Sequence, residues 1–266
     1  MKKKSELDVL VKEQILYPKE QLQKVRKQLP QLCIGIPKEI DGIENRVCLT
    51  PEAVALIVNN GHIVQVETGA GLNAKYSDRE FSEAGAKIVY SKQEVFDSEI
   101  VLKVDPPTVE EIGYMKTGKT LISALQMSTL HPGYISEINK KRITGIAFEF
   151  IEDKAAGKPV VKSMSEIAGS AVMQIAAEYL ISKNGMGVIL GGVTGVPSTK
   201  VLILGAGTVA EYAARTAIGL GAEVKVFDSH LYRLRRLKLN LGLQLYTSVI
   251  DTVNLRKELR EADVVI

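Results

Sequence analysis

A glycine-rich turn between an apolar run and a helical segment constrains this chain more than any other feature. Residues 201–204 read Val-Leu-Ile-Leu, the composition of a strand buried in a parallel sheet. They lead directly into Gly205, Ala206, Gly207, Thr208, Val209 and Ala210. Gly205 permits a tight turn, Gly207 lets main-chain N–H groups approach a pyrophosphate, and Ala210 keeps helix and strand close. The motif predicts a Rossmann-type dinucleotide site.

An acidic residue supports the same interpretation. The strand-like run 223–227 ends on Asp228, about 20 positions beyond Gly205. A carboxylate at this place can accept hydrogen bonds from both ribose hydroxyls and repels a 2′-phosphate, which favours NAD as the cofactor over NADP. His230 and Arg233 follow closely, so Arg233 is also a cofactor-binding candidate and NADP is the alternative. The other alternative is a strand–helix–strand turn that binds no ligand.

Short apolar runs recur before this turn, with helical patterns between several of them. They lie near residues 32–36, 62–67, 87–90, 100–104, 120–125 and 144–148. Such alternation predicts βαβ units and mainly parallel sheets. A long helical segment, 165–182, separates this series from the one that begins at Lys200. We expect an α/β protein with two doubly wound parallel-sheet domains, a flavodoxin-like one over residues 31–160 and a Rossmann domain over residues 161–266.

The first 30 residues differ from the rest in charge. Residues 1–30 hold eight Lys and Arg against four Asp and Glu, with apolar residues at near-helical spacing, which predicts a basic helical extension. The remainder is nearly neutral, so we expect no nucleic-acid partner. A secretory signal and a membrane span are not supported, because no long apolar run is present. Cys33 and Cys48 lack metal-site or disulfide-framework spacing, so we expect no metal and a cytoplasmic location.

One segment imitates a different nucleotide motif. Residues 113–120 read G-Y-M-K-T-G-K-T and match the consensus of the P-loop of nucleoside-triphosphate-binding proteins. A P-loop needs a buried strand before it and a helix after it. Here a helix start precedes the segment and the strand-like run 121–125 follows. The inverted order indicates that Lys119 lies in an exposed turn.

Several short segments elsewhere form a specific set. They read Ile34-Gly-Ile-Pro-Lys-Glu39, Glu44-Asn-Arg-Val-Cys-Leu-Thr-Pro51, Glu67-Thr-Gly-Ala-Gly71, Met164-Ser-Glu-Ile-Ala-Gly169 and Gly191-Gly-Val-Thr-Gly-Val-Pro197. Together they resemble the alanine dehydrogenase and transhydrogenase α-subunit family over roughly residues 32–266, and they favour the alanine dehydrogenase side. The resemblance implies a homo-oligomeric oxidoreductase with its substrate in a cleft, the first domain being the substrate domain. It implies that the full-length enzyme, of which we expect this chain to be a C-terminally incomplete fragment, converts L-alanine, NAD and water to pyruvate, ammonia and NADH.

The resemblance also assigns roles to individual residues. Arg46 matches the arginine that holds the substrate carboxylate, and a guanidinium offers a planar fork that suits this group. The alternative for Arg46 is an ordinary surface arginine. Ser165 matches a serine that contacts the cofactor at the domain junction. The glycine loop, with Val209 and Asp228, matches the family's NAD loop.

Two positions depart from the family pattern. The substrate-binding lysine of the family falls on Asp105, and its active-site histidine falls on Gln126. Asp repels an anionic substrate, and Gln cannot donate a full proton near pH 7 as His can. Lys103 and His131 lie nearby and are candidates for compensation. The alternatives to an active dehydrogenase are an NAD(H)-binding relative with altered or lost catalysis and a transhydrogenase α-type component.

The last strand-like run also bears on function. From Val201 onward, strands are expected near 201–204, 223–227, 243–247 and 263–266, and the chain stops inside the fourth. Dinucleotide folds bind their ligand across two halves of the sheet. We therefore expect the Rossmann domain to be incomplete and the nicotinamide half to be missing.

Overall fold

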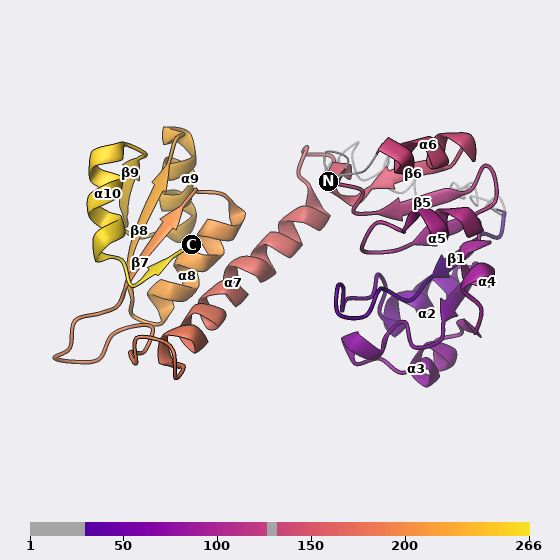
Figure 1. Ribbon diagram of the computed structural model, residues 1–266, viewed down its shortest axis with the longest axis horizontal. Helices are drawn as coiled ribbons and strands as arrows, with labels where there is room; N and C mark the ends of the chain where they lie inside the picture. Colours follow the sequence, from indigo (N-terminus) through magenta and orange to yellow (C-terminus); the bar gives the residue numbers. More distant parts are fainter. Residues whose placement is uncertain (1–29, 127–131) are drawn as a thin grey trace, which may run out of the picture.

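The computed structural model describes residues 30–126 and 132–266. The basic extension expected over residues 1–30 lies, except for its last residue, outside the described residues, as does His131. The described part forms two lobes joined by the long helix α7 (Pro159–Ile181), and each lobe contains one sheet (Figure 1).

The first lobe holds a six-stranded sheet in which every neighbouring pair of strands is parallel. Its strands are β1 (Cys33–Ile36), β2 (Ile63–Glu67), β3 (Lys87–Val89), β4 (Ile100–Leu102), β5 (Thr120–Ser123) and β6 (Thr144–Ala147). Its helices are α2 (Pro51–Asn59), α3 (Asp78–Glu83), α4 (Lys92–Phe96), α5 (Val109–Tyr114) and α6 (Pro132–Lys140), with 3₁₀ turns η1 (Leu72–Ala74) and η2 (Phe148–Phe150). The expected α/β alternation is confirmed.

The strand order of this sheet corrects one detail of the expectation. A flavodoxin-like domain has the order 2-1-3-4-5, whereas this sheet has the order β3-β2-β1-β4-β5-β6, which is that of a dinucleotide-binding fold. The physical reason is that β4 returns to the free side of β1, with Ile34 opposite Ile100. A side chain at Gly35 would come within 2.2 Å of the carbonyl oxygen of Val95, so glycine allows α4 to pack closely there. The doubly wound class itself is confirmed.

The second lobe holds a four-stranded parallel sheet in the order β10-β7-β8-β9. Its strands are β7 (Lys200–Leu204), β8 (Glu223–Asp228), β9 (Tyr246–Val249) and β10 (Val264–Val265), and its helices after α7 are α8 (Thr208–Gly219), α9 (Leu231–Leu241) and α10 (Thr252–Glu261). Read from β9 to β10, this is the order 3-2-1-4 of a doubly wound sheet, and the strand order reverses between β7 and β10.

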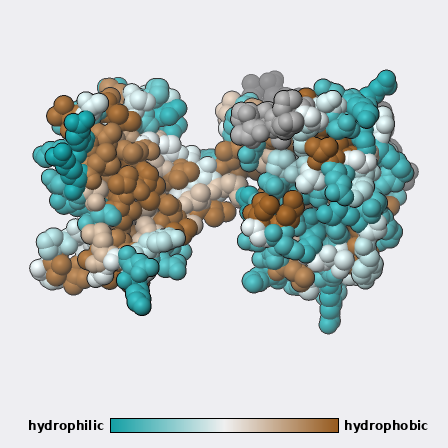
Figure 2. Space-filling view, viewed as in Figure 1, coloured by the Kyte–Doolittle hydropathy of each residue, from teal (hydrophilic) through white to brown (hydrophobic). Residues whose placement is uncertain are grey.

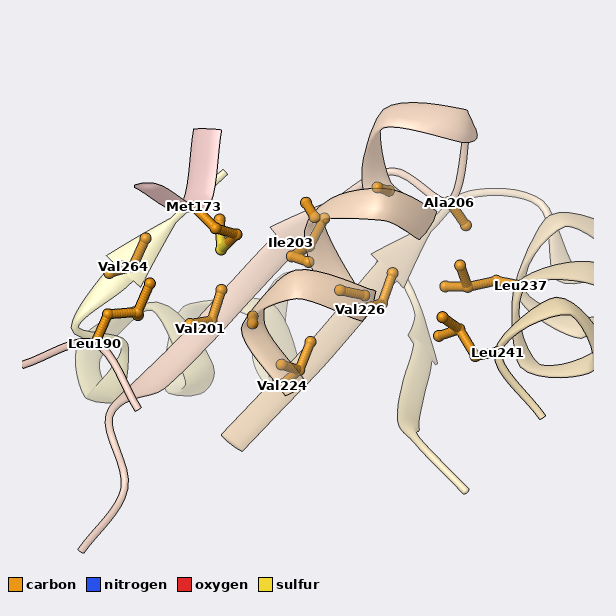
Figure 3. Close-up of a cluster of buried hydrophobic side chains, with 14 of the residues drawn as sticks. Met173, Leu190, Val201, Ile203, Ala206, Val224, Val226, Leu237, Leu241 and Val264 are labelled. Carbon is orange, nitrogen blue, oxygen red and sulfur yellow. The ribbon is translucent and has the colours of Figure 1, made fainter. Parts of the chain in front are cut away.

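The core of the second lobe lies between its sheet and its helices (Figure 3). Val201, Ile203 and Val226 point from the strands toward side chains of α7 and α9, among them Met173 and Leu237. Other apolar side chains stay at the surface of this lobe and along α7, as Figure 2 shows.

Two of the expected element boundaries move. Helix α7 begins at Pro159, six residues before the expected start, because proline suits the first turn of a helix. Strand β9 begins at Tyr246, because α9 ends on Gly242 in the left-handed conformation and the chain needs a few residues to enter the sheet.

Helices α7 and α8 pack closely against each other. A side chain at Gly169 would come within 2.4 Å of the carbonyl oxygen of Val209, so only glycine permits this approach. The contact fixes the start of α8, and with it the glycine turn, against the helix that joins the two lobes.

The P-loop-like segment lies where its sequence context predicts. Residues 113–120 run from the end of α5 into β5, so the strand follows the turn instead of preceding it. None of the helices in the described ranges combines the length and the hydrophobicity that a membrane-spanning segment needs.

Candidate functional site

The glycine turn connects β7 to α8. Gly205 has a φ of +110°, a conformation that disfavours residues with a side chain. Gly207 is the N-cap residue of α8, no side chain caps this helix, and a Cβ at Gly207 would meet open space. The first main-chain N–H groups of the helix, from Thr208 and Val209 onward, therefore lack side-chain partners, and open space lies beside them. Such a terminus suits an anion such as a pyrophosphate.

Asp228 lies at the end of β8 and holds this turn in place. Its Oδ2 accepts a hydrogen bond from the Ala206 N–H at 2.8 Å, and its Oδ1 accepts one from the His230 N–H at 2.6 Å. Burial opposes ionisation of Asp228, but these hydrogen bonds outweigh it, so the pKa of the carboxyl group is lowered. Arg233 approaches the same carboxylate, with Nη1 3.9 Å from Oδ2. The structure thus brings Asp228, Arg233 and the glycine turn together.

A cavity of about 940 Å³ lies between the lobes, and residues of both contribute to its wall. Arg46 and Gln126 come from the first lobe, Ser165 from α7, and Val209 from the first turn of α8. Four candidate residues from distant parts of the sequence therefore share one cavity. Asp105 is not among its lining residues, although its neighbour Val104 is.

The guanidinium of Arg46 already has a carboxylate partner. Its Nε and Nη2 donate to the two carboxylate oxygens of Glu44 at 2.9 and 2.7 Å. This hydrogen-bonded pairing lowers the pKa of Glu44 to about 2, against the opposing effect of burial. The remaining nitrogen, Nη1, lies 3.2 Å from the sulfur of Met164 on α7, which also lines the cavity. Arg46 therefore presents the Nη1 side of its fork to the cavity.

A buried ion pair lies where the strand order of the first sheet reverses, between β1 and β4. The Nζ of Lys103 lies 2.7 Å from Oε2 of Glu39, and Lys103 is fully buried. The other oxygen of Glu39 accepts a hydrogen bond from the Val104 N–H. Burial raises the pKa of Glu39, and the pairing with Lys103 opposes that rise. Lys103 is thus buried and paired with Glu39. It does not line the cavity, so it does not replace the substrate-binding lysine that the family has at the position of Asp105.

The main-chain N–H of Gln126 is hydrogen-bonded to an acidic residue that follows the neighbouring strand. Gln126 has a φ of +44°, and its N–H donates to Oε1 of Glu149 at 2.6 Å. Glu149 lies in η2 directly after β6, and β6 pairs with β5 beside it. Glu149 also lines the cavity.

Sequence reasoning missed Glu39, Glu44 and Glu149. Glu39 follows β1, and Glu149 follows β6, so a search for acidic residues just after expected strands would have found both. Glu44 lies two positions before Arg46, but such spacing is common and carries little signal. Among the described residues, no cluster of His, Cys, Asp and Glu could hold a metal ion.

Comparison with known proteins identifies the family of the chain. The sequence pattern of the family described as "Alanine dehydrogenase/PNT, N-terminal domain" matches residues 35–168, and that of the "C-terminal domain" matches residues 171–266. The chain is 40% identical to an alanine dehydrogenase of Bacillus subtilis over 88% of its own length and 62% of that protein. The chain thus spans less than two thirds of the length of this relative.

Solved structures give the same result. The fold matches an L-alanine dehydrogenase with a TM-score of 0.81 and 35% identity, covering 88% of this chain and 65% of that one. It matches a transhydrogenase from Sinorhizobium meliloti with a TM-score of 0.69 and 26% identity, covering 86% of this chain and 64% of that one. The matched patterns, the strand order and the paired lobes lead to one conclusion: the chain belongs to the alanine dehydrogenase/PNT family.

Proposed function

We propose that this protein is an NAD-dependent, alanine dehydrogenase-like oxidoreductase that converts L-alanine, NAD and water to pyruvate, ammonia and NADH. One observation carries the proposal. Arg46, which suits a carboxylate, and Val209, in the first turn of the dinucleotide helix, line the same cavity. A small amino acid bound by Arg46 would therefore lie next to the helix that receives the cofactor.

Family membership implies a pyridine nucleotide, and the residues at the turn fit one. The uncapped start of α8 would bind the pyrophosphate, with Gly205, Ala206, Gly207 and Thr208 supplying close-approaching backbone. The ionised Asp228 favours NAD over NADP, since it repels a 2′-phosphate. When bound, NAD accepts a hydride from the substrate. Ser165 and Arg233 are the further candidates for cofactor contacts.

Arg46 is the candidate substrate anchor. Glu44 occupies its Nε and Nη2, so the orientation of the guanidinium is fixed before a ligand arrives. A carboxylate would then bind from the cavity side, at the Nη1 edge. Pre-orientation of this kind reduces the entropy lost on binding.

The experiment combines a binding assay with a turnover assay. NADH binding is followed by the change in its fluorescence, and turnover by L-alanine-dependent formation of NADH at alkaline pH. We expect Arg46→Gln to lower the apparent affinity for L-alanine at least tenfold and to leave NADH binding unchanged. Arg79→Gln, an exposed arginine of the same lobe paired with Glu83, is the matched control. Binding of NADH by the full-length protein without any turnover of L-alanine would contradict the proposed reaction.

A second candidate is an NAD(H)-binding relative with altered or lost catalysis. It is favoured by Asp105 and Gln126 at the two family positions and by the burial of Lys103. The double variant Asp105→Lys with Gln126→His should then create or strengthen turnover of L-alanine. Histidine tolerates the left-handed conformation found at position 126 better than most residues. No gain in turnover would count against this candidate.

A transhydrogenase α-type component has weaker support, because the match to the transhydrogenase has the lower identity and TM-score of the two. A coding region for a membrane subunit next to this gene would favour it.

We further propose the domain boundaries 31–160 and 161–266, a homo-oligomeric assembly and a cytoplasmic location. The family matches on either side of residue 170 support the division near α7.

A further inference from the structure

A carboxylate in the wall of the cavity has one oxygen without a partner. Glu149 accepts a hydrogen bond from Gln126 through Oε1. Its second oxygen, Oε2, is buried and has no hydrogen-bond partner. Nearly all buried polar atoms in native proteins are paired, and an exception requires an explanation, such as a functional role of the group or a water or ion that donates to it.

The location of Glu149 distinguishes it from comparable groups. In the described part of the chain, Asp97 and Tyr134 also have a buried polar side-chain atom without a partner. Neither of these two residues lines the cavity between the lobes, whereas Glu149 does. Of the three, Glu149 is therefore the one that a molecule bound in the cavity could approach.

The cavity combines opposite charges with an apolar wall. Arg46 supplies a cation and Glu149 an anion, while most of the remaining wall consists of apolar side chains such as Val47, Phe148 and Val161. The lining residues described include no lysine and no histidine. These features match a small molecule that carries a carboxylate, an ammonium group and an apolar body. Its carboxylate would pair with Arg46 and its ammonium group with Glu149, and such pairs are stronger in surroundings of low polarity.

We propose that Glu149 recognises the ammonium group of an α-amino acid whose carboxylate is bound by Arg46. Its Oε1 stays with the Gln126 N–H, and Oε2 accepts the hydrogen bond from the substrate nitrogen. A 2-oxo acid brings no donor and leaves Oε2 unpaired, whereas a 2-hydroxy acid offers only a neutral hydroxyl, which is a weaker partner for a carboxylate than a charged ammonium group. Glu149 thus determines specificity for the amino acid. The inference rests on the proposed function, since it concerns the substrate of the same site.

The test compares two ligands of the same shape. Binding of L-alanine and of L-lactate to the full chain is measured by calorimetry in the presence of NADH. Glu149→Gln keeps a carbonyl oxygen for the Gln126 N–H but loses the charge. We expect it to weaken L-alanine binding roughly ten- to a hundredfold, the usual effect of losing a hydrogen bond to a charged group, and to leave L-lactate binding unchanged or stronger. Glu152→Gln, an exposed residue outside the cavity wall, should change neither.

The other possible outcomes distinguish a failure of the role of Glu149 from a failure of the proposed function. A change of less than twofold for L-alanine in Glu149→Gln, or an equal loss for both ligands, would overturn the role of Glu149 while leaving the proposed function intact. The variant Arg46→Gln should weaken both ligands, because both carry a carboxylate. If the unaltered protein binds NADH but neither ligand, the proposed substrate class fails and the role of Glu149 fails with it.

Discussion

The main-chain N–H of Ala206 donates a hydrogen bond to Oδ2 of Asp228 at 2.8 Å, which ties the middle of the glycine turn to the end of the adjacent strand. The carboxylate is almost fully buried, and its other oxygen accepts from the His230 N–H. Asp228 therefore has a structural role in addition to its proposed contact with a ribose. It holds the loop that leads into the start of α8, where we propose that the pyrophosphate binds.

This relationship predicts the effect of Asp228→Asn on cofactor binding. One amide oxygen cannot replace two carboxylate oxygens, so one of the two N–H groups loses its acceptor. We expect NADH binding to weaken at least tenfold and the free energy of unfolding to fall by about 1–2 kcal/mol. Fluorescence titration and urea unfolding measure the two effects.

Asp251→Asn is the matched control for this variant. Asp251 also follows a strand of the same sheet, and its carboxylate accepts from the N–H groups of Val253 and Asn254 at the start of α10. Both N–H groups bond to the same oxygen, Oδ1, which asparagine keeps as its amide oxygen, so this variant should change the free energy of unfolding little and leave NADH binding unchanged. Equal losses of NADH affinity in both variants would show that the effect is not specific to Asp228 and the glycine turn.

The close approach of α7 and α8 predicts a large effect for Gly169→Ala. A methyl group there would come within 2.4 Å of the Val209 carbonyl oxygen and 2.7 Å of the Cβ of Tyr212. The two helices must separate, so we expect a loss of about 1–3 kcal/mol in the free energy of unfolding, together with weaker NADH binding. Gly219→Ala, at the end of α8 with nothing nearby, should be neutral or stabilising. Thermal unfolding of both variants decides the matter, and a neutral Gly169→Ala would contradict the close packing.

The elements that could be predicted from the sequence are those whose residues lie close together along the chain. The apolar run, the two glycines and Asp228 fixed the strand, turn, helix and second strand of the dinucleotide unit, because these signals lie within about 30 residues of one another. The order around Lys119, with the strand after the turn, was predictable for the same reason. Helix α6 carried no such signal, and Tyr134 on it packs into a core cluster together with Ile112 of α5, which lies far from it in sequence.

Relationships between distant residues were not predictable in this way. The strand order 3-2-1-4-5-6 depends on which side of β1 receives β4, and short apolar strands look alike in either arrangement. The pair of Glu39 with Lys103 joins two neighbouring strand ends that are far apart in sequence. Gln126 was singled out from the sequence, but its partner Glu149 follows a different strand, so the pattern around Gln126 contained no indication of it.

The buried pair of Lys103 with Glu39 predicts a strongly non-additive pair of substitutions. Lys103→Met alone leaves the Glu39 carboxylate buried without its cation, and we expect the free energy of unfolding to fall by about 3–5 kcal/mol. Adding Glu39→Gln removes the uncompensated charge and should recover a substantial part of this loss. Urea unfolding of the two single variants and the double variant measures the coupling. Additive losses would mean that the two residues do not stabilise each other.

The pair of Glu44 with Arg46 predicts a pH-dependent contribution to stability. The pKa of Glu44 falls from its usual 4.5 to about 2 in the folded protein, so the folded state favours the ionised carboxylate. Its stabilising effect is complete above the pKa of the unfolded chain and is lost as the pH falls toward the folded pKa. Because more than half of the Arg46 side chain is exposed, we expect a modest effect, about 1 kcal/mol near neutral pH.

The comparison of Glu44→Gln with the unaltered protein tests this directly. Urea unfolding should show the unaltered protein to be the more stable at pH 6, and the difference should shrink steadily between about pH 5 and pH 3, where Glu44 becomes protonated in the unfolded chain. Glu83→Gln, which removes one half of an exposed pair with Arg79, should cost only a few tenths of a kcal/mol. A difference that does not change between pH 6 and pH 3 would contradict the ion pair, since a neutral packing effect of the Glu44 side chain would not depend on its charge.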